Sequence, residues 1–595
     1  MNNKLTLVTT DLESTWLGES KLIFVGEWCR LHSRKKVWSK LNSEVLPFIW
    51  DDREKLHGDF YRVQSLNEDL LKELTPILNC IHGVSEDVRY WRLLLGYWLN
   101  AYTTVVLNRF ECLEKRKIIK SDFQTFILKF DELSLVTRHT AEFIEQASES
   151  SLWNHFLFGL LMRDMPDIHK VYIDSSIPNQ KNGRKKFSNV IRSYVKRTIN
   201  LLGSKLKKND AYFFSSTYIS KCNLARLNLS LAQVPLPSIM PTFNPKNRIQ
   251  FRDWSLPIKE SHTEFEKILR KLLPQIIPSI FIEDYSDLRQ KIKTSVLPTS
   301  PKIIFTSNQH FSDDYFKAWA AEKIKGGTRL IIGEHGGLGV GLFNGTHAYE
   351  LSIADLYIST GWSSQSNPKI VPLGNFRVKG KQVKPANDGH FLLVCGVMPR
   401  YSFDIRSMAI SSQMTSYFDD LYDFFGALPP HLQNKTLVRT FYAKDYGWSQ
   451  IPRWLERYPN VKIDDGEQPL WDVARNCSLF IATYNATTFL ESFSHNFPTV
   501  MFWNPLMWEI KPEAQIYFEE LKRVGVFHEG FLSAAAHISN ISGNIFNWWN
   551  SDAVQKARLN FCNAYSLEST EVIFELKKIL VNELSVEDHS RDLLN

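Results

Sequence analysis

The sequence predicts an α/β protein with two Rossmann-like lobes and a helical elaboration in the N-terminal lobe. The chain has 595 residues, which is several times what one hydrophobic core usually covers. Between residues 391 and 503, five short apolar runs alternate with helix-like segments, as they do in a Rossmann-like sheet. A weaker alternation of the same kind runs from residue 265 to 359 and predicts a second sheet.

The predicted N-terminal lobe spans residues 1–385. Three extended runs, at 5–9, 21–25 and 45–50, are each followed by polar residues and predict strands that lead to the carboxyl edge of a parallel sheet. Apolar residues at helical spacing predict a helical insertion at about 66–208, with helices over 68–81, 85–115, 141–163 and 187–207. Further βα units are expected from the runs at 265–273, 302–306, 315–324, 328–333 and 355–359.

The predicted C-terminal lobe spans residues 386–550. Its strands are expected at 391–395, 436–440, 461–463, 479–483 and 499–503, and its helices at 408–426, 451–457, 469–476 and 487–495. Helices are also expected around 513–523, 553–565 and 569–584. The pattern leaves open whether the helices in 551–595 cover this lobe or pack back on the first.

Charge and cysteine content exclude some classes of protein. Lys plus Arg is 71 against 64 for Asp plus Glu, a net charge of +7, and basic runs at 184–186 and 205–208 read as solvated helix faces. They give little support to nucleic acid binding, although contact with anionic lipid or phosphate stays open. Seven single cysteines, without zinc spacing, indicate a reducing compartment and no structural metal.

Neither the N-terminus nor the most apolar run predicts export or membrane insertion. The first residues turn acidic too early for a secretory signal, so a cytoplasmic location is expected. The apolar run at 93–107 is interrupted by Asn100 and is too short to span a bilayer, so it predicts a buried helix.

Polar residues stand between the strand at 479–483 and the helix at 487–495. They are Tyr484, Asn485, Thr487 and Thr488, with Glu491 in the first turn of the helix. Hydroxyls and the free N–H groups of a helix start suit a phosphate, and a carboxylate one turn later can accept a ribose or sugar hydroxyl. The alternative is plain N-capping of the helix by Asn485 or Thr487.

A glycine-rich turn follows the run at 328–333. Glu334 and His335 stand at its mouth, followed by Gly336 and Gly337, which allow a ligand to approach the backbone. A carboxylate or imidazole there can act as general base for a sugar hydroxyl. The turn is not GxGxxG and has no Walker lysine, so neither dinucleotide binding nor ATP hydrolysis is supported.

Carboxylates stand beside tryptophans near the N-terminus. Glu27 precedes Trp28, and Asp51, Asp52 and Arg53 follow Trp50. This combination suits a carbohydrate, whose C–H faces pack on aromatic rings, and makes Glu27 and Asp51 competing candidates for the base. Taken separately, each residue also fits a helix cap, a core aromatic residue or a surface ion pair.

Two arginines are expected at the carboxyl edge of the C-terminal sheet. Arg400 follows the strand at 391–395, and Arg439 lies in the strand at 436–440. They therefore point to the same edge as the 484–491 turn, where they can neutralise a diphosphate or a sugar carboxylate without a metal.

The chain resembles a family of transferases encoded in bacterial O-antigen and surface-polysaccharide clusters. The resemblance runs nearly end to end through TTDLESTW (9–16), FVGEWC (24–29), LPFIWDDR (46–53), IHGV…RYWRLLLGYWL (81–99), EHGGLGVGLF (334–343), ADLYISTGW (354–362), KDYGW (444–448) and TYNATTFLE (483–491). It implies a two-lobed GT-B-like transferase that uses a nucleotide-activated donor. In related turns we expect Gln before the His-Gly pair, whereas this chain has Glu334. Either Glu334 or His335 is therefore a candidate for the base.

The leading expectation is a glycosyltransferase without a cofactor. Its donor is expected to be a CMP-linked acidic sugar, or a UDP- or GDP-sugar, and its acceptor a glycan or lipid-linked glycan, with peripheral contact at the inner membrane left open. One alternative is a polyol-phosphate transferase that uses a CDP-alcohol. Another is a non-catalytic carbohydrate-binding or assembly protein with a transferase fold.

Overall fold

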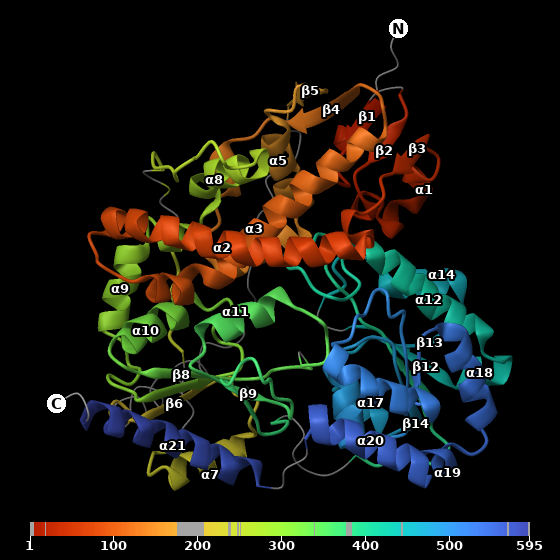
Figure 1. Cartoon of the computed structure of the whole chain (residues 1–595). Coiled ribbons are helices and arrows are strands. Elements are labelled where there is room, and N and C mark those ends of the chain that lie inside the picture. Colours follow the sequence, from red (N-terminus) through yellow and green to blue (C-terminus); the bar gives the residue numbers. More distant parts are fainter. Residues whose placement is uncertain are drawn as a thin grey trace, which may run out of the picture.

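The computed structural model describes residues 5–17, 20–174, 207–235, 240–246, 249, 252–337, 339–376, 383–441, 444–567 and 571–592. These residues form three parallel sheets flanked by helices (Figure 1). The α/β class with Rossmann-like lobes is confirmed, and the N-terminal part contains two sheets. The basic run at 184–186 and, apart from residue 207, the helix expected at 187–207 lie outside the described residues.

The N-terminal sheet has five strands in the order β3-β2-β1-β4-β5. They are β1 (Leu5–Val8), β2 (Leu22–Phe24), β3 (Ser43–Val45), β4 (Phe123–Leu128) and β5 (Ile168–Ile173). The third strand was expected at 45–50, but β3 already ends at residue 45. Ile49–Asp51, in the expected strand, forms a short 3₁₀ turn instead. Strands β4 and β5 fall inside the predicted helical insertion, so that part of the prediction was wrong.

Strand β4 was missed because it lies between helices and its apolar residues alternate with half-buried ones. Its residues Phe123, Thr125 and Ile127 are buried while Gln124 and Phe126 are half-buried, which is the alternation of a strand. The helices of this region are α2 (Arg53–His82), α3 (Val88–Glu114), α4 (Thr140–Glu149) and α5 (Ser151–Met162).

Helix α3 contains the apolar run at 93–107 and is largely buried. It packs against α2 on one side and against α10 (Asp314–Lys325) and α11 (Gly345–Ile353) on the other. It therefore joins the N-terminal sheet to the helices of the next sheet (Figure 1). Within the described ranges, no helix combines the length and apolar character needed to cross a membrane.

The middle sheet has the order β10-β9-β8-β7-β6. Its strands are β6 (Tyr212–Ser215), β7 (Ile303–Thr306), β8 (Arg329–Gly333), β9 (Leu356–Ser359) and β10 (Ile370–Pro372). The last helix of the chain, α21 (Val572–Asp592), packs on this sheet: Leu576 and Leu580 join its apolar cluster, and Arg329 pairs with Glu583 at 2.7 Å.

The C-terminal sheet has six strands in the order β13-β12-β11-β14-β15-β16. They are β11 (His390–Val394), β12 (Thr436–Arg439), β13 (Lys462–Asp464), β14 (Cys477–Ala482), β15 (Thr499–Phe502) and β16 (Phe527–His528). The first five match the expected strands to within about two residues, whereas the two-residue β16 gives no recognisable pattern. The surrounding helices include α12 (Met414–Ala427), α14 (Gln450–Arg457), α16 (Thr487–Ser494), α17 (Pro512–Arg523) and α20 (Asp552–Tyr565).

The loop after β8 ties the middle sheet to the C-terminal sheet. Antiparallel bridges join Gly341 to Ile510 and Asn344 to Arg406. The Lys511 backbone N–H donates to the Val340 carbonyl at 2.9 Å. The glycine turn at 334–339, which opens this loop, is thus anchored against the C-terminal sheet.

Candidate functional site

The glycine turn packs directly against the first turn of α16. A Cβ atom added to Gly336 would lie 2.5 Å from the Thr487 hydroxyl oxygen. One added to Gly337 would lie 2.7 Å from a Leu490 methyl carbon. Two segments that the sequence predicted separately, at 334–337 and 484–491, therefore meet, and a side chain larger than glycine at either position would displace Thr487 or Leu490.

The start of α16 has no side-chain cap. Its N-cap is Ala486, which has no side chain able to accept from the helix, so the N-capping alternative for Asn485 and Thr487 does not apply. The first N–H groups of the helix therefore keep their affinity for an anion. Asn485 is only 7% exposed, and its side-chain oxygen has no hydrogen-bond partner in the described part of the chain.

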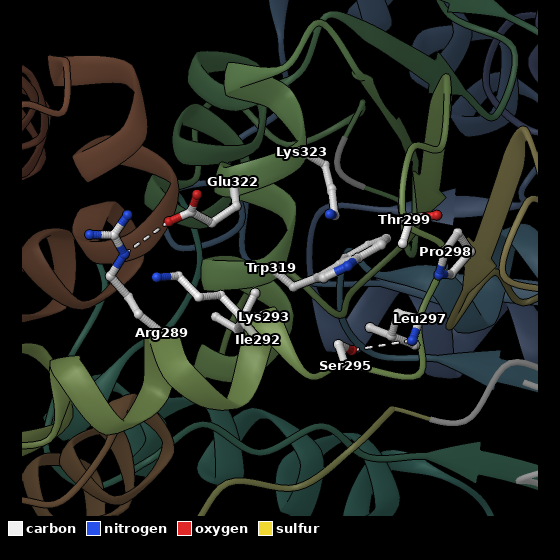
Figure 2. Close-up of a pocket in the computed structure, with 10 residues that line it drawn as sticks. All are labelled: Arg289, Ile292, Lys293, Ser295, Leu297, Pro298, Thr299, Trp319, Glu322 and Lys323. Atoms are coloured by element: carbon white, nitrogen blue, oxygen red, sulfur yellow. Dashed lines mark hydrogen bonds and ion pairs between the residues drawn. The ribbon is translucent and has the colours of Figure 1, made fainter.

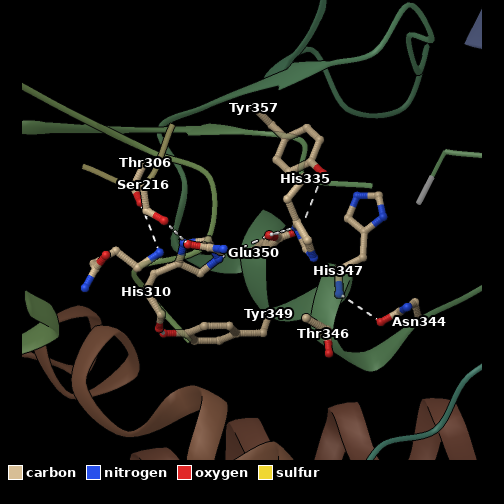
Figure 3. Close-up of polar contacts among 12 residues, drawn as sticks. Ser216, Thr306, His310, His335, Asn344, Thr346, His347, Tyr349, Glu350 and Tyr357 are labelled. Atoms are coloured by element: carbon tan, nitrogen blue, oxygen red, sulfur yellow. Dashed lines mark hydrogen bonds and ion pairs between the residues drawn. The ribbon is translucent and has the colours of Figure 1, made fainter. Parts of the chain in front are cut away.

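His335 is held by a buried carboxylate. Its Nδ1 lies 3.3 Å from Oε1 of Glu350, a residue of α11 with no exposed surface, while the His335 side chain remains 24% exposed. His310 approaches the same carboxylate through Nε2 at 3.1 Å. The Tyr357 hydroxyl donates to its other oxygen at 3.4 Å. Figure 3 shows Glu350 lying between the two imidazoles.

The charge of Glu350 favours one arrangement of the His335 protons. Burial would raise the pKa of Glu350, but the charge of His335 and the hydrogen bond from His310 outweigh burial and lower it to about 2. The carboxylate is therefore anionic near neutral pH and lies 3.3 Å from Nδ1 of His335. With a proton on Nδ1, the other nitrogen, Nε2, carries the lone pair that a general base needs. Burial lowers the pKa of His310 in spite of its bond to Glu350.

Glu334 is the weaker of the two base candidates. One of its oxygens accepts from the Thr360 backbone at 2.8 Å, the Thr360 hydroxyl at 3.0 Å and the Trp362 indole at 2.8 Å. The other accepts from the Gly339 backbone at 3.2 Å. Burial raises the pKa of Glu334, but these donors occupy both oxygens and orient the carboxyl to shape the turn.

Lys511 supplies a positive charge beside the same turn. Its ammonium group lies over the Trp362 ring, 4.6 Å from the centroid, and has no ion pair or hydrogen bond in the described ranges. Burial lowers the pKa of Lys511, and the negative charge of Glu334 offsets part of this decrease. An anion bound at the turn would compensate this charge.

Arg400 and Arg439 have other partners. Arg400 donates to the carbonyl oxygens of Tyr446 and Trp28, each at 3.0 Å, and lies 3.5 Å from Asp11. Arg439 pairs with Asp464 and donates to the Gln468 carbonyl at 2.6 Å. Both guanidinium groups thus stabilise loops and sheet contacts.

The remaining candidates of the C-terminal lobe have different surroundings. Glu491 accepts from the Trp471 indole at 2.8 Å, so one of its oxygens is committed to the protein. Thr487 and Thr488 lie in the first turn of α16 and are half-buried. Tyr484 packs beside Trp508, at 6.0 Å between ring centroids, and against Gly396.

The N-terminal candidates lie where the N-terminal sheet meets the C-terminal sheet. Trp28 is 1% exposed and donates to the Thr9 carbonyl, so its ring is closed to a sugar. Asp52 caps α2. Glu27 pairs with Arg30, Asp51 accepts from Gln413 at 3.2 Å, and Arg53 pairs with Glu509. These contacts run to neighbouring loops rather than to the glycine turn.

Three residues of the site escaped sequence reasoning: His310, Glu350 and Lys511. His310 follows β7 by four residues, so the rule that ligands bind at the carboxyl edge of parallel strands points to it. Glu350 lies inside a helix and Lys511 in a loop of the other sheet, and neither has a local signal. Among the described residues, no group of three or more metal-ligating side chains comes together.

The parallel sheets bring the uncapped start of α16 next to His335, which the buried carboxylate of Glu350 holds. This arrangement defines an α/β protein suited to group transfer. The chain belongs to the LIC12162 family of transferases, whose family model matches residues 5–580. No curated protein matches the chain.

Among solved structures, the crystal structure of Acinetobacter baumannii MurG is similar. The two are 11% identical, with a TM-score of 0.30, over 62% of this chain and 99% of that one. A TM-score of this size does not superpose individual residues, so no role for a side chain follows from it.

Proposed function

We propose that the protein is a GT-B-type glycosyltransferase that uses a nucleotide-activated sugar. The supporting observation is the position of His335. A buried carboxylate holds this histidine one residue before a glycine that packs on the uncapped first turn of α16. This supports a base for an acceptor hydroxyl next to a site for the donor's phosphate.

The donor's phosphate binds at the first turn of α16. The N–H groups at the helix start and the Thr487 hydroxyl provide hydrogen bonds, and Lys511 provides the positive charge that Arg400 and Arg439 were expected to provide. A CMP-linked acidic sugar or a UDP- or GDP-sugar fits this set of groups. Glu491 lies one turn into the helix and is the proposed partner of a ribose or sugar hydroxyl.

In the reaction, His335 Nε2 takes the proton of an acceptor hydroxyl while that oxygen bonds to the anomeric carbon. The bond from the anomeric carbon to the phosphate oxygen breaks, and its electron pair leaves with the nucleotide. Glu350 stabilises the imidazolium that forms, as the acid of a catalytic triad does. The acceptor is a glycan or lipid-linked glycan of a bacterial surface polysaccharide such as O-antigen. A cytoplasmic location and peripheral contact with the inner membrane stay predictions.

The same groups also suit a polyol-phosphate transfer from a CDP-alcohol, because the phosphate site lies beside the base. Analysis of the product separates the two reactions: sugar transfer makes a glycosidic bond, and the alternative makes a new phosphodiester.

Thermal unfolding with a panel of CMP, CDP, UDP and GDP tests the donor class. A ligand at 100 times its Kd stabilises the folded protein by about 2.7 kcal/mol, which raises the Tm measurably. His335→Ala is expected to keep this shift and lose turnover. If no nucleotide shifted the Tm at millimolar concentration, a non-catalytic carbohydrate-binding or assembly role would replace the proposal.

A further inference from the structure

A cavity of about 120 Å³ lies between α9 (Tyr285–Lys293), α10 and the loop before β7 (Figure 2). The loop leads into the start of β7, and the Lys323 end of α10 leads into the start of β8. The cavity therefore lies at the amino edge of the middle sheet. His335 follows the carboxyl end of β8, a strand of five residues that spans about 16 Å. The cavity is thus separate from the candidate active site.

The wall of the cavity has more positive than negative charge. Arg289, Lys293 and Lys323 line it together with one carboxylate, Glu322. Arg289 donates to Glu322 at 3.1 Å, so these two charges offset each other. Lys293 and Lys323 have no ion pair within 4.0 Å in the part of the chain that the structure describes. Burial lowers the pKa of Lys323, and a bound anion would reverse this effect.

Trp319 adds a hydrogen-bond donor to the same wall. The residue has no exposed surface, and its indole N–H has no partner among the described residues. Figure 2 shows its ring between the Lys323 side chain and the 295–299 loop. A buried donor without a partner destabilises the fold, and an acceptor oxygen in the cavity would satisfy it.

We propose that this cavity is an accessory site for the phosphate or carboxylate group of an anionic ligand. Two ammonium groups and an N–H donor match the oxygen atoms of such a group. The volume holds one small anion with few waters, which excludes a whole nucleoside. The ligand is therefore a small anion, or an anionic group of a larger molecule whose remainder lies outside the cavity.

Calorimetric titration of the full chain with inorganic phosphate and with glucuronate tests the site. The test variant Lys293→Ala/Lys323→Ala removes both free ammonium groups. The control Lys291→Ala/Lys302→Ala removes the same charge from exposed positions outside the cavity lining. We expect at least about tenfold weaker binding by the test variant and unchanged binding by the control.

A third variant, Trp319→Phe, keeps the ring and removes the N–H donor, and it is expected to weaken binding by a few fold. Stronger binding of phosphate identifies a phosphorylated ligand, and stronger binding of glucuronate identifies an acidic sugar. The proposal would be overturned if the two double variants lost binding affinity equally. It would also be overturned if neither probe bound to the unaltered protein at tens of millimolar. Neither result depends on transferase activity.

Discussion

Gly336 lies against Thr487 so closely that a methyl group on the glycine would come within 2.5 Å of the threonine hydroxyl oxygen. Gly336 follows a strand of the middle sheet, and Thr487 begins a helix of the C-terminal sheet. The contact therefore joins the middle sheet to the C-terminal sheet at the site. It also brings the uncapped start of α16 next to His335.

Gly336→Ala is expected to lower the free energy of unfolding by about 1–3 kcal/mol and to weaken nucleotide binding, because Thr487 must move away from the added methyl group. Gly58→Ala is the control: a Cβ there meets nothing within 4 Å, and α2 gains up to about 1 kcal/mol from alanine. Denaturant unfolding measures both. Equal stability of the two variants would rule out the close contact.

His335→Gln is expected to reduce kcat by about 10²–10⁴ while nucleotide binding is kept, because the ring nitrogen that accepts the proton is lost. The control is His169→Gln, at an exposed position of β5. Turnover and thermal shift are measured on the same preparations. Full turnover of His335→Gln would exclude this histidine as the base.

Glu350 is expected to stabilise the fold in a pH-dependent way. Its pKa is lowered from an ordinary value of 4.5 to about 2, so the unfolded chain takes up the proton first as pH falls. The contribution, at most about 3 kcal/mol, is complete above pH 4.5 and is lost as pH falls toward 2. The stability difference between the unaltered protein and Glu350→Gln should shrink over this range. A difference that stayed constant from pH 6 to 3 would contradict an anionic Glu350.

Lys511→Met is expected to raise the KM for the nucleotide-sugar by about tenfold, a loss of about 1.4 kcal/mol, because the site loses its positive charge. Lys511→Arg should recover part of this affinity. Lys522→Met is the control, since Lys522 pairs with Glu529 on the surface at 2.6 Å. If both methionine variants had the same KM as the unaltered protein, the phosphate would be bound without Lys511.

Arg400→Met is expected to act on stability rather than on KM. The substitution leaves Asp11 and the Trp28 carbonyl without their buried partner, which costs about 3–5 kcal/mol. Denaturant unfolding and steady-state kinetics separate the two roles. A variant with unchanged stability and a raised KM would support the donor contact that the sequence suggested.

The strands of the C-terminal sheet were predictable because a buried parallel strand is a short apolar run between helices. Because ligands bind at the carboxyl edge of parallel strands, the segments at 334–337 and 484–491 could then be identified as candidate sites. Strands β4 and β5 were missed because half-buried or exposed residues interrupt their apolar runs, next to helices with a stronger pattern. For Trp28, the sequence shows an aromatic ring beside a carboxylate, but only packing decides that the ring is buried.

By itself, the sequence determined the α/β class and the two segments that meet at the site, because local hydrophobic patterning and strand order place both. Only the tertiary structure decided which side chains are partners. Glu350 holds His335, Lys511 lies beside the glycine turn, and Arg400 is bound elsewhere, because these contacts join segments far apart in the chain. Local pattern carries no information about such distant partners, which the packing of whole helices and sheets selects.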